Sequence, residues 1–146
     1  MNILFVCTGN TCRSPMAEAL FNDVCRRRGI DHFSFSRGTN VFYPEPVNPK
    51  TVAALKAIGT DIPAKMSAAV SEEDMIKADI ILTMTSAHKM ALKSMFPKYS
   101  EKIFTLNEKA YGKDKPISDP FGGTENVYLQ CAKELKNAVE ALADKL

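Results

Sequence analysis

The chain has 146 residues, 45% of them hydrophobic and 25% charged, with a net charge of +2. This length suits one domain with a single hydrophobic core, which we expect over residues 1–146, and the composition excludes disordered and fibrous classes. The small net charge gives no general case for nucleic-acid binding, and no apolar stretch reaches membrane-spanning length. No signal peptide is recognisable, so we expect a cytoplasmic protein whose four cysteines serve chemistry or packing.

The chain begins with a strand followed by a helix. Residues 2–6 form an apolar run typical of a buried strand. Ser14 is a good N-cap and Pro15 a good first residue for a helix that Gly29 can end. The apolar spacing predicts a buried helix face formed by Met16, Ala17, Leu20, Phe21 and Val24.

The middle of the chain continues the alternation of strands and helices. Residues 32–37 alternate like a short strand, and a cap followed by proline begins a second helix over residues 48–59. A capping box at residues 71–74 precedes a short helical segment, although Asp74 stands where the box prefers Glu or Gln. Residues 80–84 are the clearest strand in the sequence.

The last third predicts a helix over residues 86–95, a strand over residues 102–106, and a long final helix capped by Thr124. We expect the inward face of this last helix to consist of Val127, Cys131, Leu135, Val139 and Leu142. The alternation predicts an α/β fold of three layers, in which a parallel sheet carries helices on both faces. Ligands of such folds bind beyond the carboxyl ends of the strands, where the chain turns into a helix.

The loop after the first strand carries the chemistry. Cys7 and Arg13 are spaced as C-x5-R, and the backbone N–H groups between them converge at a helix N-terminus, which forms an anion cradle. Gly9 permits a positive φ or a close backbone approach, and Asn10 tolerates the left-handed region. The planar guanidinium of Arg13 matches phosphate oxygens, and this environment predicts that Cys7 exists largely as thiolate. The pattern predicts phosphoryl transfer through a cysteinyl-phosphate intermediate.

That mechanism needs an acid to protonate the leaving group and then a base to activate water. Asp119 lies in the stretch KPISDPFGG, where Pro120 restricts it to extended conformations. A carboxylic acid held over the phosphate serves both steps in turn.

The stretch CTGNTCRSPMAE at residues 7–18, together with DPFGG at residues 119–123, resembles the low-molecular-weight protein tyrosine phosphatase family. The order of strands and helices matches that family over essentially the whole chain. The resemblance implies a four-stranded parallel sheet with the phosphate-binding loop after the first strand. It also implies that Cys7 is the nucleophile, Arg13 the phosphate clamp and Asp119 the general acid.

The resemblance implies roles for the rest of the loop as well. Ser14 stabilises the cysteine as leaving group, Asn10 holds the shape of the loop, and Cys12 traps an oxidised Cys7 as a reversible disulfide. The substrate-binding residues that we predict are Thr8, Gly9, Asn10, Thr11, Cys12, Ser14 and Phe121.

Around this loop the resemblance is less complete. Family members have an aromatic pocket rim, for which Phe42 or Tyr43, together with Phe121, are the candidates here. Members also place a His after the second helix, where it supports the loop Asn. The stretch DIPAKMSAA has none and Lys65 lies nearest that place, although Ser36 can still brace Asn10.

One position narrows the substrate. Thr11 stands where family members that act on phosphotyrosine usually carry an aliphatic residue, and the chain is similar in this to the bacterial branch that dephosphorylates protein arginine. We therefore expect phosphorylated protein substrates, with phosphoarginine slightly ahead of phosphotyrosine. Arsenate reduction and a cysteine phosphocarrier remain as alternatives. We expect no cofactor, no metal, and surface or helix positions for His32 and His88.

Overall fold

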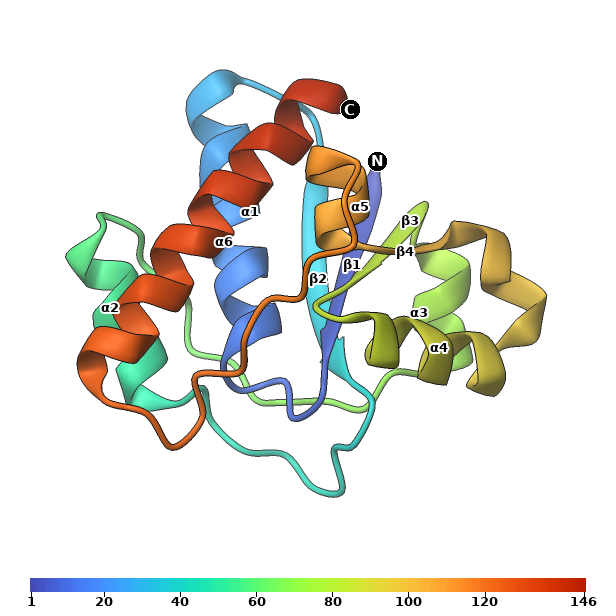
Figure 1. Ribbon diagram of the computed structural model, residues 1–146, viewed down its shortest axis with the longest axis horizontal. Helices are drawn as coiled ribbons and strands as arrows, with labels where there is room; N and C mark the ends of the chain where they lie inside the picture. The colour runs from blue at the N-terminus through green and yellow to red at the C-terminus, as the bar shows by residue number, and fades with distance from the viewer.

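The computed structural model describes residues 1–146 as a three-layer α/β fold built on a four-stranded parallel sheet (Figure 1). The strand order is β2-β1-β3-β4. The strands are β1 (Asn2–Cys7), β2 (Phe33–Gly38), β3 (Ile80–Thr83) and β4 (Ile103–Thr105). Strand β1 lies in the middle, with Cys7 in register with Gly38 of β2 and Val6 in register with Thr83 of β3. This register explains the apolar run of β1, because both of its faces are covered.

Helices cover both faces of the sheet. The larger core lies against α1 (Arg13–Arg28), α2 (Pro49–Ala57), α5 (Leu106–Tyr111) and α6 (Glu125–Lys145). The smaller core lies against α3 (Glu72–Lys77), α4 (Ser86–Met95) and the 3₁₀ helix η1 (Pro97–Lys102). Ile3 and Phe5 point into the larger core, and Leu4 and Val6 into the smaller one, as the two-residue period of a strand requires.

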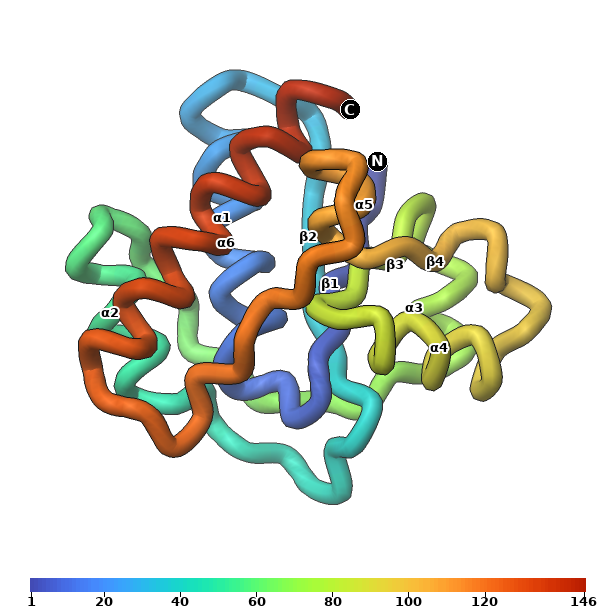
Figure 2. Tube along the Cα trace, viewed as in Figure 1, coloured from blue at the N-terminus to red at the C-terminus, as the bar shows by residue number.

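The ends of the chain and the loops that follow β1 and β2 occupy opposite sides of the molecule. Figure 2 shows both termini together at one end, while the loops that follow β1 and β2 gather at the other. The carboxyl ends of the parallel strands all face that second end, which is where ligands of such sheets bind. None of the helices is both long and apolar enough to cross a bilayer.

Most of the predicted elements are present, and the buried face of α1 is confirmed at all five of its positions. The capping box at Ser71 is also confirmed, with the Asp74 carboxylate accepting from the Ser71 backbone N–H at 3.0 Å. The expected final strand over residues 102–106 is shorter. The strand ends at Thr105, whose side chain caps α5. The apolar pattern of the sequence did not predict this helix.

Two expectations about helices are wrong. Helix α1 begins at Arg13 with Cys12 as its N-cap, and Ser14 does not cap it because the Ser14 hydroxyl faces Cys7 instead. In α6, Val127 is exposed and Tyr128 is buried in its place, so the inward face is rotated by one residue at its first turn. Thr124 does cap α6, accepting from the Val127 N–H.

Candidate active site

The loop from Cys7 to Arg13 turns at Asn10, which has a φ of 57°, as its sequence position predicted. The Asn10 side chain is buried inside the loop. Its Nδ2 donates to Ser14 Oγ at 2.8 Å and to Ser36 Oγ at 3.0 Å, and its Oδ1 accepts from the Ala68 N–H at 3.1 Å. These bonds explain why an otherwise unfavourable left-handed residue is stable here. Gly9 does not adopt a positive φ, so that part of the expectation is wrong.

Cys7 ends β1 and faces the first turn of α1. Its Sγ lies 2.9 Å from Ser14 Oγ, and the thiol is 3% exposed. Ser14 already accepts from the Asn10 amide, so its single proton is free to point toward the sulfur; the Arg37 carbonyl oxygen, at 3.4 Å, is the more distant alternative. A hydroxyl that donates to sulfur can stabilise a thiolate.

Arg13 is buried beside this cysteine and connects the loop to the segment before α6. Its Nη1 donates to the Ile117 carbonyl oxygen at 3.0 Å, and its Nη2 lies 3.5 Å from Asp119 Oδ2. The other Asp119 oxygen accepts from the Phe121 N–H at 3.1 Å, while the Asp119 side chain stays 52% exposed. The structure thus brings Cys7, Arg13 and Asp119 together although Asp119 is far away in the sequence.

A pocket of about 310 Å³ opens above Cys7. We call Cys7, Asn10, Arg13 and Ser14, none of them more than 5% exposed, the floor of the site. The walls include Thr11, Glu45 and Asp119. The mouth carries the predicted aromatic residues, which we call the rim: Phe42, Tyr43 and Phe121.

The family model described as low molecular weight phosphotyrosine protein phosphatase matches residues 2–146. The chain belongs to this family. A cysteine-to-serine variant of YwlE arginine phosphatase with a phosphorylated active-site serine superposes with a TM-score of 0.96 at 40% identity, over 100% of this chain and 95% of that one.

Relatives within the low molecular weight phosphatase family carry two kinds of name. The protein-arginine-phosphatase of Bacillus subtilis is 41% identical over 148 residues, covering 100% of this chain and 97% of the relative. The low molecular weight protein-tyrosine-phosphatase PtpB of Staphylococcus epidermidis is 37% identical over 145 residues, covering 99% of each. Family membership therefore leaves the choice between arginine and tyrosine to the pocket of this chain.

His88 is a residue of this phosphatase site that the sequence did not reveal. It lies on α4 as expected, but it is 8% exposed and its ring contacts the loop: Nε2 is 2.7 Å from Thr8 Oγ1, and Nδ1 is 2.9 Å from Thr85 Oγ1. Burial, reinforced by the Arg13 guanidinium and opposed by the Asp119 carboxylate, lowers the pKa of His88 to about 4. A neutral imidazole therefore holds Thr8. The three-residue spacing from the cap Thr85 is the one local signal of this contact.

Gly38 is a second residue whose importance for the loop the sequence did not reveal. It ends β2 directly beneath the loop, where a Cβ would lie 2.5 Å from the Thr8 carbonyl oxygen and 2.6 Å from Val41 Cγ2. Only glycine lets the two backbones approach this closely.

All four cysteines are free and buried. Cys25 and Cys131 belong to the core, and burial raises the pKa of Cys131 to about 12. Cys12 lies under the loop with its Sγ 3.5 Å from the Tyr128 hydroxyl. Its pairing with Cys7 under oxidation stays a prediction. No three His, Cys, Asp or Glu side chains lie close enough together to hold a metal ion.

Proposed function

We propose that the protein is a phosphatase that removes phosphate from protein side chains through a cysteinyl-phosphate intermediate at Cys7. The observation that carries this proposal is the sulfur of Cys7, which lines the same pocket as the buried Arg13 and lies 2.9 Å from the Ser14 hydroxyl. The YwlE variant whose active-site serine is phosphorylated supports the same point of attack, because a serine that replaces the nucleophile traps the phosphoryl group.

In the first half of the reaction, the loop N–H groups and the Arg13 guanidinium hold the phosphate oxygens. The Cys7 thiolate attacks phosphorus, and the bond between phosphorus and the substrate nitrogen or oxygen breaks. Asp119, as a carboxylic acid, gives its proton to that leaving atom. Its position at the pocket wall, 52% exposed and anchored through one oxygen to the Phe121 N–H, suits this transfer.

In the second half, the Asp119 carboxylate takes a proton from water as the water oxygen attacks phosphorus. The sulfur–phosphorus bond breaks, inorganic phosphate leaves, and the electron pair returns to Cys7. The Ser14 hydroxyl stabilises the departing thiolate by donating to it.

We propose phosphoarginine as the preferred substrate. Two features of the pocket support it: Thr11 offers a small polar wall, and the Glu45 carboxylate lines the space that a cationic guanidinium would enter. The Bacillus subtilis relative is named a protein-arginine-phosphatase. Phosphotyrosine is the alternative, supported by the name of the staphylococcal relatives.

The test compares a phosphoarginine protein and a phosphotyrosine peptide on one preparation. We expect faster turnover of phosphoarginine, and loss of turnover of both substrates in Cys7→Ser. Normal turnover in Cys7→Ser contradicts the mechanism, and a long-lived phosphorylated Cys7 in the wild type, seen by intact mass, supports a phosphocarrier instead. Thr11→Ile should move the preference toward phosphotyrosine. An unchanged ratio of phosphoarginine turnover to phosphotyrosine turnover would show that Thr11 does not determine the substrate.

We also propose that the enzyme acts in the cytoplasm. Its four cysteines are free, and the reducing conditions of that compartment keep a nucleophilic thiol from being oxidised.

A further inference from the structure

An apolar groove of about 380 Å³ lies next to the pocket above Cys7. It is formed by α2 together with the chain segments before and after that helix. We propose that this groove binds an apolar side chain of the protein substrate, about two to four residues away from the phosphorylated residue. The proposal rests on the proposed function, because it takes the pocket above Cys7 as the place where the phosphorylated side chain enters.

The groove and the pocket are separated by a short two-stranded ribbon. Its two segments run antiparallel, with Pro46 paired to Met66. Beside that pair, the Ser67 N–H donates to the Glu45 carbonyl oxygen at 2.7 Å, and the Glu45 N–H donates to Ser67 Oγ at 2.9 Å. Glu45 and Ser67 line the pocket, whereas their neighbours Pro46 and Met66 line the groove. Because successive residues of an extended chain point to opposite sides, the two cavities flank one ribbon.

The ribbon and α2 are both attached to the phosphate-binding loop. Asn48, two residues after Pro46, donates its backbone N–H to the Thr11 carbonyl oxygen at 3.0 Å. The Thr51 hydroxyl on α2 donates to the same oxygen at 3.3 Å, and the next residue, Val52, lines the groove. The groove therefore keeps a fixed position relative to the Thr11 side of the pocket. A preformed groove of this kind orders fewer groups when it takes up a side chain, which lowers the entropic cost of binding.

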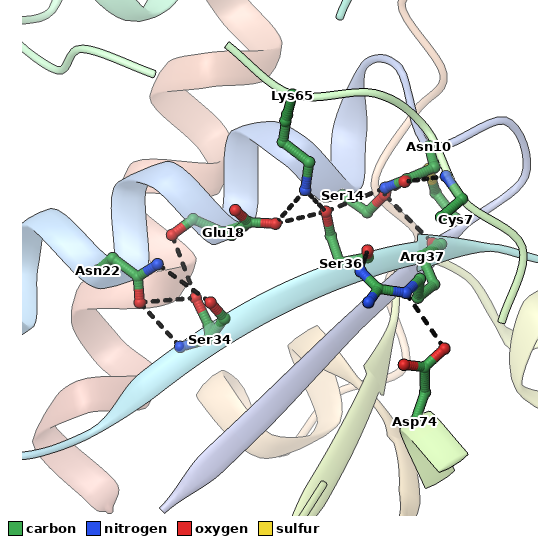
Figure 3. Close-up of polar contacts among 11 residues, drawn as sticks. Cys7, Asn10, Ser14, Glu18, Asn22, Ser34, Ser36, Arg37, Lys65 and Asp74 are labelled. Atoms are coloured by element: carbon green, nitrogen blue, oxygen red, sulfur yellow. Dashed lines mark hydrogen bonds and ion pairs between the residues drawn. The ribbon is translucent and has the colours of Figure 1, made fainter. Parts of the chain in front are cut away.

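The chemistry of the groove favours an apolar occupant. Apart from Lys65, every residue that lines it is apolar. The Lys65 ammonium group is paired with the Glu18 carboxylate and donates to Ser36 Oγ at 2.8 Å, so its charge is already compensated (Figure 3). Pro46 and Pro63 have no backbone N–H to offer a ligand. The groove therefore gains free energy by withdrawing an apolar side chain from water, and it is poorly suited to a charged group or to an added strand.

The size of the groove favours a single side chain over a second copy of this chain. Eight residues line it, whereas a stable interface between proteins takes about 20–30 residues on each partner. Other exposed apolar side chains, such as Phe33, Ile76 and Met90, lie on β2, α3 and α4 and do not extend the groove.

The groove is instead continuous with the rim of the pocket. Phe42 and Tyr43 of the rim lie on the same segment as Glu45 and Pro46, only a few residues earlier. An extended polypeptide advances about 3.3 Å per residue. A substrate chain whose phosphorylated side chain enters the pocket can therefore cross the ribbon and place a nearby side chain in the groove.

The experiment measures kcat/KM for a set of peptides that share one phosphorylated residue in a background of serine and glycine. The phosphorylated residue is the one, arginine or tyrosine, that the enzyme dephosphorylates faster. A single leucine is moved through the first four positions on each side of it. We expect one position, about two to four residues away, at which leucine raises kcat/KM by about threefold to tenfold over the background peptide, because part of its side chain is withdrawn from water.

Two variants test whether the groove is the origin of this preference. Val52→Asp and Met66→Asp each place a carboxylate in the groove, and both side chains are exposed, at 41% and 53%, so the fold should tolerate either change. In each variant the ratio of kcat/KM for the leucine peptide to that for the background peptide should fall to about one. Lysine at the same position should then be preferred over leucine, because it pairs with the new carboxylate. Met90→Asp is the matched control and should keep the wild-type ratio, since Met90 is 72% exposed on α4 and lines neither cavity.

Equal kcat/KM for all peptides with the wild type overturns the proposal, and so does a leucine preference that survives in both Val52→Asp and Met66→Asp. A wild-type dimer that dissociates in Val52→Asp, measured by sedimentation, also overturns it, because the groove would then bind a second copy of the chain. Each of these outcomes leaves the phosphatase activity itself in place. Absence of turnover on every phosphorylated peptide would instead contradict the proposed function.

Discussion

The floor and the rim of the pocket are built in opposite ways. Every floor side chain is at most 5% exposed and is held by hydrogen bonds, whereas the three rim aromatics are between 66% and 89% exposed. A floor of this kind is preorganised for one small anion, while the rim contacts whatever carries that anion. Under the proposed function, the floor carries out the chemical step and the rim contacts the protein substrate. Asp119 lies between them, since it is half exposed and yet paired with Arg13.

The largest expected effect tests whether Asp119 takes part in the chemical step together with the floor residues. Asp119→Asn removes the proton donor while keeping the shape, so kcat should fall by roughly 10²- to 10⁴-fold with little change in KM. Steady-state kinetics on a phosphoarginine protein would measure this fall. Asp114→Asn is the control, because the exposed Asp114 carboxylate accepts from the Ser86 hydroxyl and does not line the pocket. A change in KM alone would show that Asp119 contacts the substrate, as the rim does, without taking part in the chemical step.

The second prediction concerns His88, which supports the loop next to the floor through its contact with Thr8. The pKa of His88 is about 4 in the folded protein and about 6.5 in the unfolded chain, so the unfolded chain takes up the proton first as the pH falls. The free energy of unfolding should therefore decrease between pH 6.5 and pH 4, by up to about 3 kcal/mol from this group.

His88→Gln should remove that part of the pH dependence. Urea unfolding at pH 7 and at pH 4.5, for the wild type and the variant, would show the difference. An equal loss of stability in both proteins on acidification would mean that His88 is not held neutral by its surroundings.

The third prediction disturbs the backbone of the loop that carries the floor residues. Gly38→Ala places a methyl group against the Thr8 carbonyl oxygen and Val41, so the free energy of unfolding should fall by about 1–3 kcal/mol and kcat by about tenfold. Thermal unfolding and kinetics together measure both effects. Gly29→Ala is the control, since that glycine caps α1 with open space around it and should lose some stability without losing kcat. If both variants lose kcat alike, the close approach at Gly38 is not what holds the loop.

The smallest effect belongs to the rim. Phe42→Ala should raise KM for a phosphorylated protein by about threefold to fivefold, because the ring is 89% exposed in the free enzyme and gains contacts only with the substrate. For a small substrate such as p-nitrophenyl phosphate, KM and kcat should stay unchanged. A fall in kcat on both substrates would show that the rim takes part in the chemical step.

Local chemistry made much of this protein predictable from its sequence. The apolar run of β1, the C-x5-R loop and the proline after Asp119 are contiguous signals, and each depends on neighbouring residues for its meaning. Caps at Ser71 and Thr124 are equally local, because a side chain there bonds a backbone group three residues on. From these the fold class, the position of the loop and its likeness to a phosphatase family followed without coordinates.

Only the tertiary structure decided which side chains from distant parts of the sequence contact one another. Ser14 has the residue type of a helix cap and is followed by a proline, yet its hydroxyl faces Cys7 at the end of β1. His88 reaches Thr8, and Lys65 reaches Glu18, across dozens of residues. Such contacts leave no periodic trace in a sequence, since they depend on where the packing of helices against the sheet places each side chain.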